Sequence, residues 1–354
     1  MTNDIDIADV LKDPNKDFTK ISGLTDTDEN YSNNVPQNSQ YFSEEEFMQY
    51  LNANKISNQS HIKIISSNIA NLLAKLSSFK IFLQNISNES NKPNIIAVTE
   101  THLHESKNHG YSQLELQNLL PGYTFFHEDR KNKRGGGVGI FIEDGLTDNA
   151  HVASDKFFYE KIFEGLAVKL PNVGSRPNTS LIILTLYRQP NDNNNNQFLE
   201  LLEEWLCQFD KKSNELVITG DMNLDLLKYE SHAATSNYLD LMASHGLLPG
   251  ITRPTRIKHS SATLIDHLFT KQTNLTSGIL VSELAGSHGY TDHYPIFGLL
   301  KATGHVKSSV GMITKKYFTK DGHRNRRDGL LQENWTEFYQ QTDVTKAYQI
   351  LHDK

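Results

Sequence analysis

The chain of 354 residues lacks the features that define several common classes of protein. Its one cysteine, Cys207, excludes an intramolecular disulfide and any cysteine-rich zinc site, and such a composition is typical of a reducing compartment. No apolar stretch follows Met1, and no run approaches the roughly 18 apolar residues that a membrane helix needs. We therefore expect no membrane association and a location inside the cell, nuclear or cytoplasmic.

A net positive charge is also absent, because the formal charge at pH 7 is −7. The excess of negative charge lies in residues 1–60, which hold eleven acidic side chains and four lysines. The net charge of residues 61–354 is therefore zero. Between Lys301 and Arg327, eight basic side chains accompany one acid, and this segment could meet phosphates or form a solvated tail. Overall charge therefore neither requires nor excludes nucleic acid as a partner.

Composition and periodicity divide the chain into segments. Residues 1–40 are rich in Asp, Asn, Ser and Thr and poor in large apolar groups, which predicts a disordered acidic tail. Residues 41–60 predict a short helical lead-in, with a helix from Tyr41 to Asn54, Ser43 as its N-cap and three glutamates in the first turn. Residues 61–300 have the pattern of one packed domain, and a basic segment, 301–354, follows it.

Strand-length apolar runs alternate with segments of helical period in residues 61–300. The expected helices cover residues 70–86, 198–209 and 237–244. Successive strands often read as hairpins, which favours an α/β fold with two mixed, mainly antiparallel sheets and outer helices. The expected strands cover residues 61–65, 95–98, 123–127, 138–142, 163–170, 181–187, 215–219, 264–270, 278–281 and 296–300.

A polar tetrapeptide, Gly220–Asn223, directly follows the apolar run 215–219. Asp221 and Asn223 are two residues apart, so both side chains point the same way from a strand end. A carboxylate beside a neutral amide suits the task of orienting a water next to a phosphoryl group. The same tetrapeptide also forms ordinary turns at the ends of strands.

Other polar residues stand at the ends of apolar runs in a similar way. Glu100 follows residues 95–98 and offers the hard oxygen that Mg²⁺ prefers, while Asn68 could add a neutral ligand, orient Glu100 or form a turn. His293 could exchange a proton with a phosphate or a water, and Asp266 is placed to orient its ring. Asp266 is expected within an apolar strand, where an unpaired carboxylate is costly.

Three further features give weaker signals. The glycines at 135–137 precede strand-like residues instead of a helix, so they do not form a phosphate-cradling loop of known type. His102 and His104 have no partner at zinc spacing. Cys207 lies on an apolar helix and is expected in the core instead of serving as a nucleophile.

The order of these motifs resembles that of the endonuclease/exonuclease/phosphatase superfamily. The superfamily includes apurinic/apyrimidinic endonucleases, deoxyribonuclease I, sphingomyelinases and inositol polyphosphate 5-phosphatases. The resemblance covers about residues 61–300 and implies a four-layered α/β sandwich and Mg²⁺-dependent cleavage of a phosphoester, with Mn²⁺ as a substitute metal. The motifs that carry it are Asn68, Glu100, Gly220–Asn223, Asp266 and Thr291–His293.

Within the superfamily, the chain looks most like the endonuclease domain of LINE-type (non-LTR) retrotransposons. Residues 334–335 and 347–348 look like the helical connector toward a reverse transcriptase, which is absent from this chain. We expect a monomer that is either a free-standing endonuclease or part of a longer parent protein with a reverse transcriptase region. The segments that carry this likeness are residues 41–47, 67–72, 96–103, 134–138, 187–190 and 264–270.

The resemblance also implies roles for the residues around a metal. Glu100, helped by Asn68, would hold Mg²⁺, and Asp292 would be a further metal or polar group. Asp221 and Asn223 would position and activate the attacking water. The set of residues implied for the metal and the water is thus Asn68, Glu100, Asp221, Asn223 and Asp292.

A second set of residues is implied for the phosphate and the rest of the substrate. His293, oriented by Asp266, would stabilise developing charge or transfer a proton, and Tyr187 would hydrogen-bond the phosphate. Thr291 stands where serine is usual and keeps the hydroxyl. Thr255 is the match to a phosphate-contacting threonine, although Thr252 is nearby.

The expected reaction is Mg²⁺-dependent nicking of DNA, as in target-primed retrotransposition. Arg130, Lys131 and Arg134 form a basic hairpin loop that favours nucleic acid and would bind substrate phosphates. A phosphatase or a phospholipid phosphodiesterase on the same scaffold is the alternative, because surface loops decide the substrate. A further alternative is an inactive derivative that binds nucleic acid.

Overall fold

The computed structural model describes most of residues 39–301 and a few residues near the C-terminus. The predicted tail up to residue 38, most of the basic connector and the predicted substrate residues Lys131 and Arg134 lie outside the described residues. The described ranges are 39–58, 60–88, 91–104, 112–130, 135–147, 149–153, 158–159, 161–176, 178–190, 194–258, 261–271, 275–285, 289–301, 331–332, 334–341, 343 and 346.

The chain divides into two compact units, Met1–Ser308 and Ser309–Lys354. The second unit contains the short helix α8 (Thr336–Tyr339). All other elements named below belong to the first unit. No helix in the described part of the chain is long and apolar enough to cross a lipid bilayer.

The first sheet is mixed. β2 and β3 run parallel, as do β1 and β15, and the other neighbouring strands are antiparallel. From edge to edge, its strands are β1 (Gln40–Ser43), β15 (Thr276–Val281), β16 (Ile296–Lys301), β2 (His61–Asn68), β3 (Ile95–Thr99), β5 (Val138–Glu143) and β4 (Tyr123–Glu128).

The second sheet is also mixed, with β9 and β10 parallel and the other neighbours antiparallel. A separate two-stranded hairpin joins β12 (Arg256–Lys258) to β13 (Ser261–Thr263). The strands of the second sheet, in order, are β11 (Leu248–Pro249), β14 (Asp266–Thr270), β10 (Asn214–Asp221), β9 (Ser180–Arg188), β8 (Phe163–Leu170) and β6 (His151–Val152), with β7 (Phe158–Tyr159) also paired to β8.

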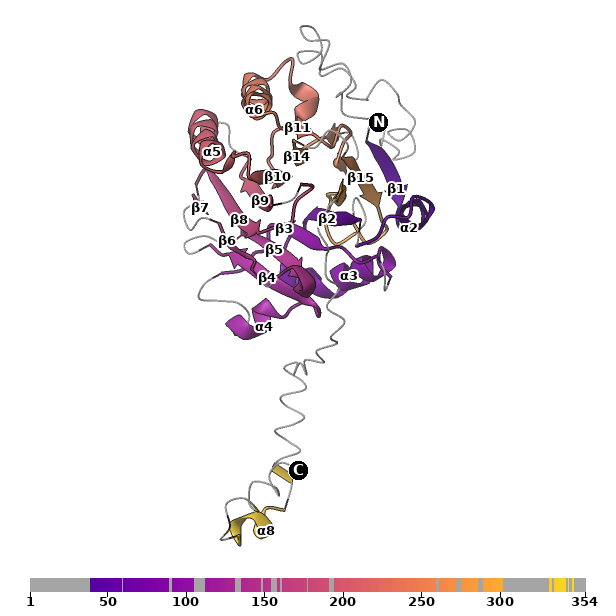
Figure 1. The fold of residues 1–354 in the computed structure, drawn as a ribbon, viewed down its shortest axis with the longest axis vertical. Coiled ribbons are helices and arrows are strands. Elements are labelled where there is room, and N and C mark those ends of the chain that lie inside the picture. The colour runs from indigo at the N-terminus through magenta and orange to yellow at the C-terminus, as the bar shows by residue number, and fades with distance from the viewer. Residues whose placement is uncertain are drawn as a thin grey trace, which may run out of the picture. The chain divides into compact units, whose positions relative to one another are not determined.

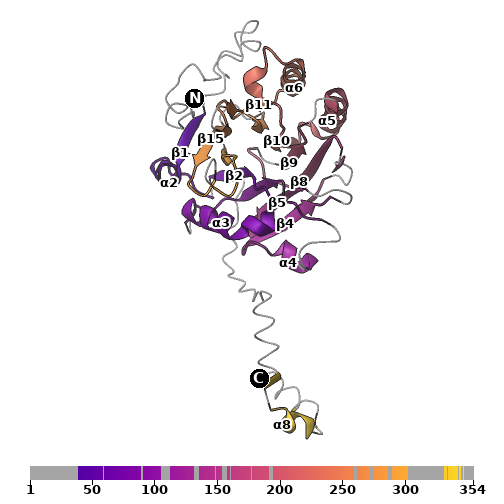
Figure 2. The ribbon, with the colours of Figure 1, turned by 180° about the vertical axis from the view of Figure 1, so that it is seen from behind.

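The helices lie beside both sheets. In Figures 1 and 2, α3 and α4 lie beside the first sheet, and α5 and α6 lie beside the second. The longer helices are α2 (Glu44–Ala53), α3 (Leu72–Asn85), α5 (Asn195–Phe209) and α6 (Ala233–Ser244), and the short ones are α4 (Gln113–Gln117) and the 3₁₀ turns η3 (Asp144–Leu146) and η5 (Leu226–Lys228).

Alternation along the strands produces two hydrophobic layers. On β2, Ile62 and Ile64 join the core that contains residues of both sheets and of α5 and α6. Ile65 points to the other face of the first sheet and joins a second core with residues of α2 and α3. Two sheets packed face to face and covered by helices form a four-layered α/β sandwich, so the predicted fold is confirmed.

Two local predictions were wrong. The predicted helix from Tyr41 begins only at Glu44, because Gln40–Ser43 pair with β15 and extend the first sheet. The segment predicted as a lead-in therefore forms part of the domain. Cys207, predicted in the core, is exposed. The buried side chains of α5 include Leu202, Trp205 and Leu206, and Cys207 lies on the opposite face of that helix.

The topology brings polar strand ends together at one edge of the sandwich. β2 ends at Asn68 and β10 ends at Asp221, while Glu100 directly follows β3. Across the second sheet, Asp221 pairs with Asp266 on one side and with Tyr187 on the other. Asp266 was predicted within a longer strand but is the first residue of β14, so its carboxylate stands at this edge.

Candidate active site

One carboxamide joins carboxylates from both sheets. Nδ2 of Asn68 donates hydrogen bonds to Oε1 of Glu100 and to Oδ2 of Asp221, each over 2.9 Å. Oδ1 of Asn68 accepts a hydrogen bond from the backbone N–H of Ala70 over 3.1 Å, which fixes the orientation of the amide. Asn68 is therefore more than a turn former, because it holds Glu100 and Asp221 close together.

Glu100 stands on strained backbone. Its φ of +53° lies in the left-handed region, where few residues other than glycine are found and which is common at functional sites. Backbone hydrogen bonds from Asn71 to the carbonyl of Glu100 and from His102 to the carbonyl of Gly136 hold this turn. Burial raises the pKa of Glu100, but hydrogen bonds with His102 and Asn68 bring it below its ordinary value, so the carboxylate is ionised at neutral pH.

Asp221 is a buried carboxylate. Only 1 % of its surface is exposed, and burial raises its pKa; the carboxylates of Asp266 and Glu100 raise it further, while His293 opposes the rise. Oδ1 of Asp221 accepts a hydrogen bond from the backbone N–H of Asn223 over 3.1 Å. Its ionised form therefore depends on nearby positive charge, which His293 or a bound cation can supply.

Asn223 also has left-handed backbone, with φ of +47°. Its Nδ2 donates a hydrogen bond to the backbone carbonyl of Arg188 over 2.8 Å. Nη1 of Arg188 in turn lies 3.5 Å from the carbonyl oxygens of Met222 and Asn223. These bonds hold the predicted Asp221–Asn223 pair in one conformation at the end of β10.

His293 and Asp266 form the predicted pair. Nδ1 of His293 lies 2.8 Å from Oδ2 of Asp266, and both side chains are buried. Burial lowers the pKa of His293, but the charge of Asp266, its hydrogen bond and the charges of Asp221 and Asp292 raise the pKa to about 9. The ring is therefore an imidazolium at neutral pH, and both its nitrogens are donors.

Two threonines hold this pair in place. The hydroxyl of Thr255 donates to Oδ2 of Asp266 over 2.6 Å, and the hydroxyl of Thr291 accepts from the backbone N–H of His293 over 3.3 Å. The hydroxyl of Thr252 instead accepts from the backbone of Ser39. Of the two candidate threonines, Thr255 is thus the one that belongs to the site.

Asp292 is occupied by a different set of partners. Its Oδ2 accepts from Nε and Nη2 of Arg256, over 2.9 and 2.8 Å, and pairs with Nζ of Lys258. Burial raises the pKa of Asp292, but these cations lower it to about 2. Its carboxylate is thus held by the β12–β13 hairpin in this structure, and the metal role that the resemblance implies has no support from this geometry.

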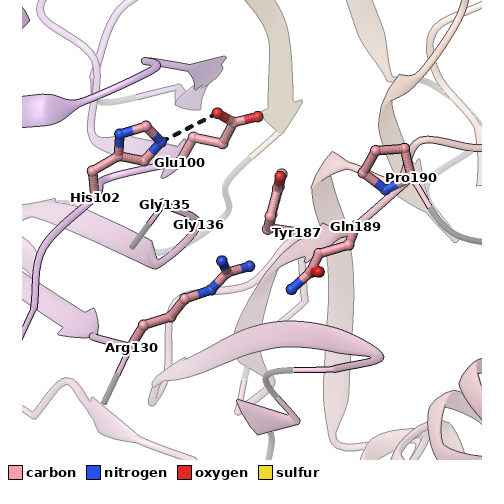
Figure 3. A pocket seen from close by; sticks show the side chains of 8 residues that line it. All are labelled: Glu100, His102, Arg130, Gly135, Gly136, Tyr187, Gln189 and Pro190. Atoms are coloured by element: carbon pink, nitrogen blue, oxygen red, sulfur yellow. Dashed lines mark hydrogen bonds and ion pairs between the residues drawn. The ribbon is translucent and has the colours of Figure 1, made fainter. Parts of the chain in front are cut away.

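A pocket of about 430 Å³ opens beside Glu100 and Tyr187 (Figure 3). Burial raises the pKa of Tyr187, and the charges of Glu100 and Asp221 raise it further, so the hydroxyl remains a hydrogen-bond donor. The residues that line the pocket are Glu100, His102, Arg130, Gly135, Gly136, Tyr187, Gln189 and Pro190.

Arg130 does not project from an exposed loop, as the sequence suggested. Its side chain is 6 % exposed and pairs with Glu164, which is fully buried. The guanidinium lies over the ring of Tyr187, with 5.9 Å between the guanidinium carbon and the ring centre. Glu164 escaped the sequence reasoning, although a glutamate inside an apolar strand is a signal that a partner is present.

The donor set fits a divalent metal. Carboxylate oxygens are ligands that Mg²⁺ prefers, and Glu100 and Asp221 supply them, while Asn68 turns its Nδ2 toward both carboxylates and its oxygen toward Ala70. Ligand atoms of Asp221, Asp266 and His293 also lie within 4.8 Å of one another, but His293 and Asp266 are bonded to each other. Glu100 and Asp221 are therefore the residues best placed to hold a cation, and Asn68 positions both carboxylates.

The model of the endonuclease/exonuclease/phosphatase family matches residues 52–293. The chain belongs to this family. Its fold is similar to that of an AP endonuclease, LMAP, from Leishmania major, with 14% identity, coverage of 79% of this chain and 97% of that chain, and a TM-score of 0.54.

A 3′ phosphatase, NExo, from Neisseria, solved with a product DNA hairpin, is 16% identical, with coverage of 67% and 98% and a TM-score of 0.50. The endonuclease domain of TRAS1, a telomere-specific non-LTR retrotransposon, is 12% identical, with coverage of 69% and 100% and a TM-score of 0.48. No curated protein matches the chain. At these identities the LMAP and NExo structures establish the fold alone.

Proposed function

We propose that the chain is a Mg²⁺-dependent endonuclease that hydrolyses phosphodiester bonds of DNA. The observation that carries this proposal is the meeting of Asn68, Glu100, Asp221, Asp266 and His293, from distant segments of the chain, at one edge of the sandwich. Membership in a family of nucleases and phosphatases agrees with it. Paired acidic groups beside an oriented histidine are suited to phosphoester hydrolysis.

Glu100, oriented by Asn68, would hold the metal, with Asp221 beside it. Mg²⁺, or Mn²⁺ in its place, would supply positive charge to the phosphate oxygens. Asn68 has a second task, since its amide keeps Glu100 and Asp221 in reach of one another despite their like charges. Asp292 serves instead to anchor the β12–β13 hairpin.

Asp221 orients the attacking water and accepts its proton. The carboxamide oxygen of Asn223 orients the same water by accepting a hydrogen bond from its other O–H group. The imidazolium of His293 donates to the phosphate and stabilises the negative charge that develops there. Asp266 acts as a positioning residue, because it binds Nδ1, so that Nε2, which lies 3.7 Å from Oδ1 of Asp292, is the nitrogen that faces the substrate. The protonated hydroxyl of Tyr187 donates a further hydrogen bond to the phosphate.

DNA is the substrate best supported by the remaining features. The sequence motifs resemble those of LINE-type endonuclease domains, and Arg256 and Lys258 share the single carboxylate of Asp292, so this pair of cations is not fully neutralised beside the site. The same proposal includes a monomeric state and a longer parent protein that contains a reverse transcriptase region. A phosphatase or a phospholipid phosphodiesterase is the alternative use of the same residues.

Conversion of supercoiled plasmid to the open-circular form tests the proposal. We expect nicking with Mg²⁺ or Mn²⁺, none with EDTA, and recovery when Mg²⁺ is added back. Parallel reactions with an inositol phosphate and with sphingomyelin should show no release of phosphate or phosphocholine. Turnover of either compound without nicking of DNA would replace the endonuclease assignment with the phosphatase-type alternative.

A further inference from the structure

The pocket beside Glu100 has a wall that metal binding and the reaction at the scissile phosphate do not explain. Of the described residues that line it, Arg130, Gly135, Gly136, Gln189 and His102 have no role in the chemistry proposed above. In Figure 3 the ends of the Arg130 and Gln189 side chains point toward each other, while the hydroxyl of Tyr187 points toward the side of the pocket where Glu100 lies. This region adjoins the metal side of the site, because Nε2 of His102 lies 3.3 Å from Oε2 of Glu100.

Arg130 is held in this wall by a buried ion pair. Glu164 accepts hydrogen bonds from Nε of Arg130 and from the backbone N–H of Gly137. Burial raises the pKa of Glu164, and these donors work against that rise. A buried ion pair seldom stabilises a protein more than apolar side chains of the same volume would. The pair therefore needs another explanation, and it fixes a guanidinium at the edge of an open pocket.

Gly136 makes room for the guanidinium of Arg130, and Gly135 borders the open pocket. Gly135 and Gly136 have φ of +84° and +65°, a conformation that favours glycine. A Cβ on Gly136 would lie 2.4 Å from the guanidinium carbon of Arg130. A Cβ on Gly135 would lie 3.7 Å from Nε2 of His102 and 3.8 Å from Nη1 of Arg130. A nitrogen of each side chain thus borders the space that a side chain at residue 135 would fill.

We propose that this pocket binds a second phosphate of the substrate strand, next in the backbone to the phosphate that is cleaved. Arg130 contacts this phosphate, and Glu164 is a positioning residue for Arg130. Guanidinium groups suit phosphate because their N–H donors match its oxygens. When the strand is bound at two successive phosphates, its scissile bond is positioned beside Asp221 and His293. This inference rests on the proposed function.

A neutral phosphate analogue in the substrate tests the inference without disturbing the protein. A DNA duplex with one mapped nick site carries a methylphosphonate, in separate preparations, at the phosphate before and at the phosphate after the scissile one. Binding is measured by fluorescence anisotropy with Ca²⁺ in place of Mg²⁺, and KM and kcat are measured with Mg²⁺. We expect one of the two positions to weaken binding about tenfold and to raise KM, with kcat nearly unchanged.

The protein side of the test is the double variant Arg130→Gln/Glu164→Gln. Both charges are removed together, so that no buried charge is left unpaired. In this variant the sensitive methylphosphonate should change binding less than twofold. The matched control is Arg176→Gln/Glu215→Gln, which removes an Arg–Glu pair at the start of β10, at the other end of that strand from Asp221. The control should keep the tenfold effect, and circular dichroism should show that both variants fold.

Three results would overturn the inference. DNA cleavage that neither methylphosphonate affects would refute the second phosphate site and leave the proposed function standing. A full tenfold effect in the Arg130→Gln/Glu164→Gln variant would place the phosphate contact on other residues. A wild-type protein that binds and cuts no DNA would refute the proposed function, and this inference with it.

Discussion

Asp266→Asn is the substitution that most sharply separates chemistry from packing at this site. Asn keeps the shape of Asp266 but removes the charge that lies 2.8 Å from Nδ1 of His293. A pKa of about 9 against an ordinary 6.5 corresponds to roughly 3 kcal/mol in favour of the imidazolium. Of the interactions that raise this pKa, the two largest come from Asp266, so we expect the pKa of His293 to fall substantially in the variant.

The raised pKa of His293 determines how the stability of the fold changes with pH. In the wild type, the pair stabilises the fold fully below pH 6.5, and this contribution is lost as pH rises from 6.5 through about 9. The Asp266→Asn variant should lack this dependence. Its turnover should also fall, by up to ~10⁴-fold where the partner carboxylate of a histidine serves catalysis.

NMR titration of the metal-free protein measures the pKa of His293 directly, and nicking rates give the turnover. His267 is an internal control, because burial lowers its pKa to about 4 and its signals should not move between pH 6 and 9. A His293 that titrates at the same pH in wild type and variant would refute the electrostatic reasoning. Lower stability with unchanged turnover of the folded fraction would assign Asp266 a structural role alone.

Three further predictions concern the residues around this pair. Glu100→Gln should weaken Mn²⁺ binding, measured by calorimetry, at least tenfold. The control Glu204→Gln, on the exposed face of α5, should bind Mn²⁺ as the wild type does. Equal Mn²⁺ affinities of Glu100→Gln and the wild type would remove Glu100 from the metal site. Gly136→Ala should lower the free energy of unfolding by about 2 kcal/mol, because of its φ of +65° and the clash with Arg130, and unchanged urea unfolding would contradict this. Asp292→Asn should lower the free energy of unfolding, measured in urea, by less than about 1 kcal/mol, because its ion pairs are partly exposed. This variant should bind Mn²⁺ with unchanged affinity, and a tenfold loss of affinity would restore the metal role of Asp292.

The sequence predicted the site best where polar residues directly follow apolar strands. Glu100 and Asp221 are such residues, and each stands where a strand of a parallel pair ends. The two strands belong to different sheets, so the packing of the sheets on each other, and not the local pattern, brings these two carboxylates together. The fold itself was confirmed, because alternation along each strand identifies its inner and outer faces. The assignment of roles to these residues stays a prediction.

Contacts between distant segments escaped prediction. The pairing of Arg130 with Glu164 joins a residue just beyond the end of β4 to a residue of β8 in the other sheet, and neither residue has a neighbour in sequence that indicates the other. The anchoring of Asp292 by Arg256 and Lys258 depends on where the β12–β13 hairpin folds back, which residue type alone does not determine. Likewise, the first strand was read as helix because its pairing partner, β15, lies more than 230 residues later.

Single-turnover nicking of supercoiled plasmid by the Asp221→Asn variant tests the central claim most directly. Asp240→Asn, on the exposed surface of α6, is the matched control. With Mg²⁺ we expect rapid nicking by the wild type and the control, and a rate at least about 10²-fold lower for Asp221→Asn, the size of loss typical for a general base. Circular dichroism should show the same fold for all three proteins. A folded Asp221→Asn variant that nicks DNA at the wild-type rate would contradict the account.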